Sequence, residues 1–177
     1  MLPFKLQKIG HVVLRASDLQ RSVEFYTQVL GFRVSDIYPE EMVPGGMVFL
    51  RCNNDHHGVA LVGGMAAPSQ QRELHHLAFE VATLDEVFRA RKLLRERGVK
   101  IVFEGRRRAG VQIAVEFLDP DAHNLEIYWG LDQIGTEGAV RPKEQWRWAH
   151  TLEEAVANPP PGQSPVLQDP TLLVKKA

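Results

Sequence analysis

The sequence predicts an α+β fold in which two βαβββ repeats pair into an open barrel, followed by a C-terminal extended and helical tail. The segments that begin at Ile9 and Leu74 pass through strand, helix cap, helix and terminating glycine in the same order. After each glycine, β-branched and aromatic runs alternate with turn residues, which is typical of strands. One such unit leaves a sheet face uncovered, so we expect the repeats to pair their sheets around a shared interior.

The first repeat opens with a β-prone run over residues 9–14, in which His11 is the third residue. Ser17 and Asp18 are helix-cap residues ahead of an apolar stripe, and Gly31 ends the predicted helix. Three strands are predicted after this glycine, over residues 32–35, 47–51 and 59–62.

The second repeat follows the same plan, with His76 third in the run 74–79, at an offset of 76 − 11 = 65 from His11. Thr83 and Glu86 have the spacing of a capping box, and Gly98 ends the helix. Strands are predicted over 99–103, 111–118 and 125–129. The repeats then occupy about 8–65 and 73–130, and we predict that they form one domain over residues 1–130.

Residues 131–177 are predicted to be a C-terminal tail, because the repeat ends there and Gly, Pro and charged residues increase. Thr151 precedes a short helical stretch that Asn158 and the following prolines must end. We expect the rest to run extended over a surface. Exposed tryptophans are costly in water, so Trp146 and Trp148 should pack on the domain or on a second subunit.

Composition excludes several classes of function. The formal net charge is 21 − 22 = −1 and the basic residues are scattered, so we expect no nucleic-acid partner. Cys52 stands alone and cannot form an intrachain disulfide, which fits a reducing compartment. No long apolar run or signal segment is found, so we expect a cytoplasmic protein without membrane contact. Domains of this size commonly associate, and we expect a homo-oligomer.

Three residues are predicted to bind a metal ion. His11 and His76 occupy equivalent places in the repeats, so a pseudo-two-fold relation would bring them together in the cleft. Glu126 interrupts an apolar strand, where a carboxylate is tolerated if it binds a cation. Two histidines and one carboxylate suit non-haem Fe(II), and Mn(II) or another divalent ion is possible. The alternative for each histidine is an ordinary hydrogen-bonded role, which we expect for His75 and, as a solvated loop residue, for His123.

These motifs resemble the vicinal oxygen chelate superfamily of glyoxalases, antibiotic-resistance proteins and extradiol dioxygenases. The resemblance covers roughly residues 8–130 and rests on residues 9–14, Phe25-Tyr26, Leu30-Gly31-Phe32, 76–79 and Asp119-Pro120 with Glu126. It implies paired βαβββ modules around a metal ion.

Residues 49–62 are similar to the corresponding stretch of type I extradiol dioxygenases, in which a histidine serves as acid and base. The resemblance implies this role for His57, with His56 facing elsewhere, although a polar turn is the alternative. Val59 to Val62 cannot coordinate a metal, so three protein ligands are expected. The implied reaction is Fe(II)-dependent cleavage of a catechol-type aromatic diol by O2, in which a near-neutral imidazole can accept and return a proton.

The chain departs from the extradiol signature at three places. The family has a tyrosine ten residues before the ligand glutamate, and here 126 − 10 is Glu116. An upstream histidine is replaced by the run Arg106-Arg107-Arg108, and Ala122 replaces a glycine. Glu116 would add negative charge if it faced the site, and an arginine could offset that charge or hold an anionic substituent. The ordinary interpretation of the arginine run is a solvated hairpin tip.

Two other classes of function stay open. One is a metal-dependent lyase, isomerase or transferase of the same superfamily. The other is a metal-free binding protein that resembles the bleomycin-resistance branch. The retention of all three ligand-type residues argues against the second, because a binding protein needs no such set.

Overall fold

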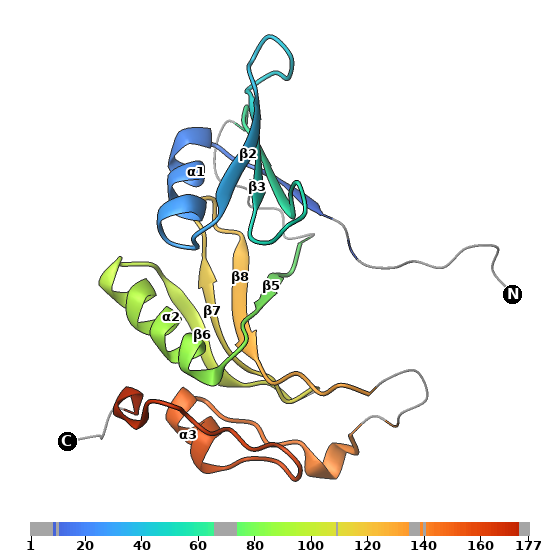
Figure 1. The fold of residues 1–177 in the computed structure, drawn as a ribbon, viewed down its shortest axis with the longest axis vertical. Helices are drawn as coiled ribbons and strands as arrows, with labels where there is room; N and C mark the ends of the chain where they lie inside the picture. Colours follow the sequence, from blue (N-terminus) through green and yellow to red (C-terminus); the bar gives the residue numbers. More distant parts are fainter. Residues whose placement is uncertain are drawn as a thin grey trace, which may run out of the picture. The chain divides into compact units, whose positions relative to one another are not determined.

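A computed structural model describes residues 9, 11–65, 74–108, 110–134, 139 and 141–173 of the chain (Figure 1). These residues form two compact units. The first contains the described residues up to Met65 together with Pro120–Ala122, and the second contains the others from Leu74 onward. Each unit holds one βαβββ module, so the predicted α+β fold with two such repeats is confirmed. None of the helices described has the length and hydrophobicity that a membrane-spanning segment requires.

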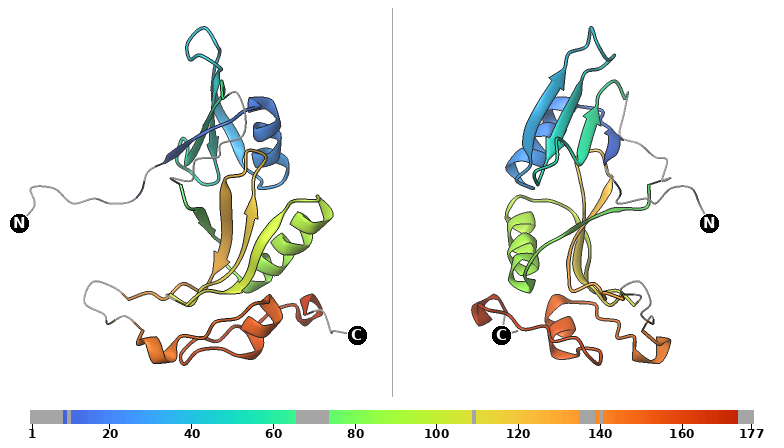
Figure 2. Two further views of the ribbon diagram at one scale, coloured as in Figure 1. Left: turned by 180° about the vertical axis from the view of Figure 1, so that it is seen from behind. Right: turned by 45° about the vertical axis from the view of Figure 1, so that its right-hand side comes forward.

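The first unit is a four-stranded mixed sheet with one helix. Its elements are β1 (Val12–Arg15), α1 (Leu19–Gln28), β2 (Arg33–Tyr38), β3 (Met47–Arg51) and β4 (Val59–Val62). The strand order is β1-β4-β3-β2, in which β1 is parallel to β4 and the other pairs are antiparallel. Helix α1 packs on one face of this sheet (Figure 2). Leu14 faces the core and is 4% exposed, whereas its neighbour Val13, on the opposite face, is 46% exposed.

The second unit repeats this topology. Its module consists of β5 (Leu77–Glu80), α2 (Leu84–Glu96), β6 (Ile101–Arg106), β7 (Ile113–Leu118) and β8 (Asn124–Trp129). The strand order is β5-β8-β7-β6, and β5 is parallel to β8. Helix α2 packs on the face where Phe117 and Leu125 are fully buried.

Local sequence signals set the helix ends. Asp18 caps α1 by accepting a hydrogen bond from Arg21 N at 3.0 Å. Glu86 accepts a hydrogen bond from Thr83 N at 2.8 Å, so the predicted capping box opens α2. Gly31 and Gly98 have positive φ of +74° and +66°, which a glycine adopts without strain after a helix. The predicted starts and stops of both helices are therefore confirmed.

Two strands continue well beyond their predicted C-terminal ends, and each contains a bulge. Strand β2 runs to Tyr38 rather than residue 35, with a shift in register between Val34 and Asp36. Strand β6 begins at Ile101 and continues to Arg106, with a shift between Ile101 and Phe103. A bulge breaks the alternation of apolar and polar side chains, which hides the continuing strand from a search for period two.

The C-terminal segment packs against strands β6 and β7 of the second unit instead of only running over a surface. It contains η1 (Lys143–Gln145), α3 (Leu152–Ala157) and η2 (Pro170–Leu172), and α3 contacts β6 and β7. Leu152 and Ala155 of α3 are fully buried. Trp148 packs on Phe103 with ring centroids 5.7 Å apart. This tryptophan therefore packs on its own domain, which was one of the two expected arrangements. The boundary between domain and tail stays a prediction.

Candidate metal centre

His11 and His57 come together at one end of the first sheet. His11 directly precedes β1, and His57 ends the loop that leads into β4. These strands are parallel neighbours, and Val12 N donates a hydrogen bond to Gly58 O at 3.0 Å. The pairing brings the two imidazole rings to 4.6 Å between centroids. The proposed acid and base therefore lies against one of the predicted metal ligands.

Neighbouring rings hold His57 in place. Its ring packs edge-on against Phe49 at 5.0 Å, and its Nδ1 lies 3.0 Å from Nδ1 of His56. Partial burial lowers the pKa of His57, and positive charge on His11 and His56 would lower this pKa further. The ring is therefore disposed to be neutral near pH 7, as a proton acceptor must be. With Nδ1 beside His56, Nε2 is the nitrogen left for a ligand.

His76 and Glu126 come together in the second unit in the equivalent way. His76 precedes β5, which is parallel to β8, and Ala78 stands opposite Glu126 in the register. The His76 Nε2 atom lies 3.4 Å from Glu126 Oε2. The Glu126 side chain is 2% exposed, and that of His76 is 36% exposed.

The surroundings of the Glu126 carboxylate favour a bound cation. Its Oε1 atom is buried and has no hydrogen-bond partner among the described residues. Burial raises the pKa of Glu126, and the charge of Glu116 adds to this shift, whereas positive charge on His76, a side-chain hydrogen bond with Gln112 and the charge of Arg107 oppose it. A buried carboxylate oxygen without a hydrogen-bond partner costs roughly a few kcal/mol, and a bound divalent ion would remove that cost. The imidazole and carboxylate donors present here therefore fit a metal such as Fe(II) or Mn(II).

Glu116 and Arg107 occupy the same sheet face as Glu126. Glu116 stands directly opposite Glu126 in the β7–β8 register, which places the two side chains on one face. Glu116 is 5% exposed, and its Oε1 accepts a hydrogen bond from Arg107 Nε at 2.7 Å and lies 2.6 Å from Arg107 Nη2 in an ion pair. The Arg107 guanidinium lies 3.6 Å from the centre of the Phe103 ring. Glu116 therefore lies on the same sheet face as Glu126, and Arg107 offsets the charge of Glu116.

The interpretation of the arginine run as a solvated hairpin tip is wrong for two of its three residues. Arg106 is fully buried and donates hydrogen bonds to Ala155 O, Asn158 O and Gln163 Oε1. Arg107 pairs with Glu116. Only Arg108 is exposed, with its guanidinium 4.8 Å from the Trp148 ring. The sequence could not reveal these two roles, because the partners of Arg106 and Arg107 lie on other segments of the chain.

Within each unit, the structure brings two of the predicted site residues together. His11 lies with His57 in the first unit, and His76 lies with Glu126 in the second. Within the described ranges, no three His, Cys, Asp or Glu side chains are grouped as metal ligands. A single site made of His11, His76 and Glu126 stays a prediction.

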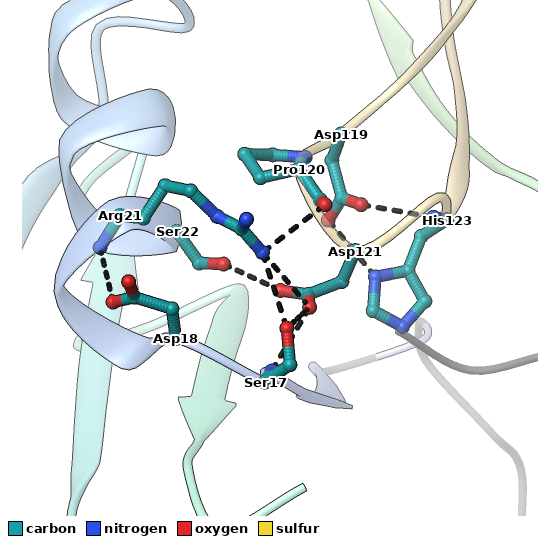
Figure 3. A network of polar contacts seen from close by, with 8 residues as sticks. All are labelled: Ser17, Asp18, Arg21, Ser22, Asp119, Pro120, Asp121 and His123. Atoms are coloured by element: carbon teal, nitrogen blue, oxygen red, sulfur yellow. Dashed lines mark hydrogen bonds and ion pairs between the residues drawn. The ribbon is translucent and has the colours of Figure 1, made fainter. Parts of the chain in front are cut away.

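His123 differs from the solvated loop residue that was expected. Its side chain is 13% exposed, and Nδ1 lies 2.9 Å from Oδ2 of Asp119 (Figure 3). His75 lies beside His76, with 2.7 Å between their Nδ1 atoms.

The family comparison agrees with these two modules. The model of the Glyoxalase/Bleomycin resistance protein/Dioxygenase superfamily matches residues 8–127, which is more than half of the chain. The chain belongs to this superfamily. The resemblance inferred from the repeated motifs is thus confirmed, and the modules are those of the vicinal oxygen chelate fold.

Members of the superfamily that resemble the chain in sequence include extradiol dioxygenases. Biphenyl-2,3-diol 1,2-dioxygenase of Paraburkholderia xenovorans (strain LB400) is 30% identical over 148 residues, which cover 81% of this chain and 48% of that enzyme. An iron-dependent extradiol dioxygenase of Rhodococcus jostii (strain RHA1) is 30% identical over 150 residues, which cover 79% of this chain and 46% of that enzyme. The chain spans about half the length of these relatives.

A solved structure shares the fold at lower identity. The fosfomycin resistance protein FosX from Listeria monocytogenes, in complex with Mn(II) and sulfate, has a TM-score of 0.57 and 20% identity. The likeness covers 71% of this chain and 92% of that one.

Proposed function

We propose that this chain is an Fe(II)-dependent extradiol ring-cleaving dioxygenase that acts on a catechol-type aromatic diol. His11, His76 and Glu126 are the proposed metal ligands, and His57 is the proposed catalytic acid and base. Mn(II) or another divalent ion is the alternative metal. The observation that carries the proposal is the position of His57, 4.6 Å from His11 between ring centroids.

The donor set supports the metal part of the proposal. Two imidazoles and one carboxylate leave coordination positions for both oxygens of a diol and for O2. A bound Fe(II) would supply electron transfer between the diol and O2. The buried Oε1 of Glu126 lacks a hydrogen-bond partner among the described residues, which supports a cation at this carboxylate.

His57 is the proposed residue that accepts and returns protons. A catechol must lose a hydroxyl proton before both oxygens can bind a cation strongly, and the Nε2 atom of a neutral His57 can accept this proton. The contacts with Phe49 and His56 restrict the ring, so the accepted proton is held near the bound diol. The same ring can return the proton later in the reaction.

The relatives support the reaction class. A biphenyl-2,3-diol 1,2-dioxygenase and an iron-dependent extradiol dioxygenase each align with about four fifths of this chain at 30% identity. An aromatic diol and O2 are therefore the proposed small-molecule partners. A homo-oligomer and a cytoplasmic location also stay predictions.

A lyase, isomerase or transferase is the second candidate, because Glu116 places another carboxylate beside Glu126. Metal analysis and an oxygen assay separate the two candidates. The protein is loaded with Fe(II) without oxygen and tested on a panel of catechols for O2 uptake and a yellow ring-fission product. Chelation of the metal should abolish both signals. Tight binding of Ni or Zn, without O2 uptake under any metal, would contradict the dioxygenase and favour the second candidate.

Substitution of His57 tests its role. His57→Ala should retain stoichiometric metal and lower kcat about 10²- to 10⁴-fold, which is the usual contribution of a general acid and base. His150→Ala, a change of the same type at an exposed residue, should leave kcat unchanged. Loss of the metal on His57→Ala would show that His57 is a ligand and that its assignment as acid and base is wrong.

A further inference from the structure

A polar pocket opens on the first unit beside the ends of β2 and β3. Its volume is about 660 Å³, and its lining includes Arg33, Ser35, Arg51, Asn53, Asn54 and His56. Most of these side chains can donate hydrogen bonds. The pocket is not part of the proposed metal site.

Arg33 and Arg51 form an uncompensated pair of like charges. They stand directly opposite each other in the β2–β3 register, where like charges destabilise a sheet. Among the described residues, neither guanidinium lies within ion-pair distance of a carboxylate, whereas Arg107 has such a partner. Arg51 Nη1 donates to Ser35 Oγ at 2.7 Å, so this side chain is held toward β2. A bound anion would remove the repulsion.

The charge of the pocket favours a small, singly charged anion. Two arginines and Asp55, which also lines the pocket, give a net charge of 2 − 1 = +1. A guanidinium fork matches the geometry of a carboxylate, and such charge-assisted hydrogen bonds are the strong ones. The net charge matches one carboxylate better than a dianion such as phosphate.

The pocket and His11 share one face and one end of the sheet. Extending the printed strand registers by one residue puts His11, Gly58, Arg51 and Arg33 in one row across β1, β4, β3 and β2. Strands lie about 4.8 Å apart, so β3 is about 10 Å from β1.

Ring contacts connect His11 to the pocket. His11 contacts His57, His57 contacts Phe49 at 5.0 Å, and Phe49 contacts His56 at 6.0 Å, which lines the pocket. A ligand bound at His11 and His57 could therefore extend along this face to the two arginines.

We propose that Arg33 and Arg51 bind a carboxylate of the substrate, which is then an aromatic diol with a carboxylate-bearing side chain. That the ligand is an aromatic diol rests on the proposed function, whereas the carboxylate site at Arg33 and Arg51 is independent of that function. Arg33 and Arg51 would be specificity-determining residues, because they select the substituent and take no part in the ring chemistry.

The test compares two ligands that differ only in charge. A catechol with a short carboxyalkyl chain at the ring carbon beside the diol, and the methyl ester of the same compound, are titrated calorimetrically into the full chain without oxygen. The acid should bind about 10- to 100-fold more tightly than the ester, and this preference should shrink in high salt. Arg33→Gln and Arg51→Gln should each remove most of the preference, whereas Arg97→Gln, at an exposed residue after α2, should retain it.

Stability provides a second measurement on the same variants. Because each change removes a like-charge contact, the Tm of Arg33→Gln and Arg51→Gln should equal or exceed that of the parent protein. Equal affinity for acid and ester, or a preference unaffected by both variants, would overturn the carboxylate site. A preference that depends on the arginines in a protein that cleaves no catechol would support the carboxylate site and contradict only the proposed reaction.

Discussion

The ion pair between Arg107 and Glu116 determines the net charge beside the buried carboxylate of Glu126. Glu116 and Glu126 stand opposite each other on adjacent strands, and both are at most 5% exposed. Two such carboxylates repel each other, and the guanidinium of Arg107 opposes this repulsion. Phe103 supports the guanidinium from one side at 3.6 Å. The pair therefore leaves Glu126 as the carboxylate with an oxygen open to a cation.

Removal of Arg107 should expose the cost of burying Glu116. We expect Arg107→Gln to lower the free energy of unfolding by about 1–3 kcal/mol, because the buried Glu116 loses its partner. The double variant Arg107→Gln with Glu116→Gln should recover most of this loss. Urea unfolding of the parent, both single variants and the double variant gives the coupling free energy of the pair. Additive losses would show that the pair is not coupled.

At the scale of elements, Asp121 of the first unit holds the segment Pro120–Ala122 at the start of α1. The carboxylate is 1% exposed and accepts hydrogen bonds from Ser17 N at 2.9 Å, from Ser17 Oγ and from Ser22 Oγ at 2.6 Å (Figure 3). Arg21 Nη2 lies 3.4 Å from the same carboxylate. Burial raises the pKa of Asp121, but the hydrogen bonds from Ser17 and Ser22 and the charge of Arg21 outweigh burial and hold this pKa below its ordinary value.

The lowered pKa predicts a dependence of stability on pH. A carboxyl group whose folded-state pKa is depressed stabilises the fold above its unfolded pKa, about 3.9 for Asp, and this contribution is lost as the pH falls through the folded-state pKa. Asp121→Asn should therefore be less stable than the parent by about 1–3 kcal/mol at pH 7, and the difference should shrink below about pH 4.

Urea unfolding between pH 2.5 and pH 7 measures this difference. Glu24→Gln, at an exposed residue of α1, is the matched control and should follow the parent throughout. A stability difference between Asp121→Asn and the parent that stays constant over this range would contradict the assigned role of the Asp121 charge.

At the scale of the whole molecule, the C-terminal segment is part of the packed structure of the second unit. Ala149 pairs with Arg106 as an isolated β-bridge, and Arg106 donates to carbonyl groups of Ala155 and Asn158. Gly105 permits this approach, because a Cβ there would lie 2.1 Å from Ala149 O. The segment therefore docks on backbone groups that β6 presents to it.

Loss of Arg106 should loosen this docking. Arg106→Met should lower the free energy of unfolding by about 2–4 kcal/mol, because buried carbonyl groups of the segment lose a charged donor. Amide hydrogen exchange in α3 should accelerate strongly, since these amides report local opening. Arg108→Met is the matched control from the same arginine run and should change stability by less than about 1 kcal/mol. Unchanged exchange in α3 for Arg106→Met would show that the segment is held by other contacts.

The sequence by itself determined the features that depend on neighbouring residues. The cap at Asp18, the capping box at Thr83 and the glycines after both helices act within one turn of chain, so their repetition was visible as a pattern. The duplication also singled out His11 and His76 as equivalent residues. The strands 47–51 and 59–62 were predicted at their observed bounds, because runs of β-branched and aromatic residues between turn residues are also local signals.

Only the tertiary structure decided which side chains share a face and which are buried. Arg106 and Arg107 are adjacent in the sequence, yet one is buried against the C-terminal segment and the other pairs with Glu116. Their directions depend on the register of β6, which a bulge near Phe103 shifts. A shift of one residue turns every following side chain to the other face, and the partners that fix this shift lie far away in the sequence. Local patterns therefore predicted the modules and the ligand types, whereas the charges around Glu126 depended on long-range pairing.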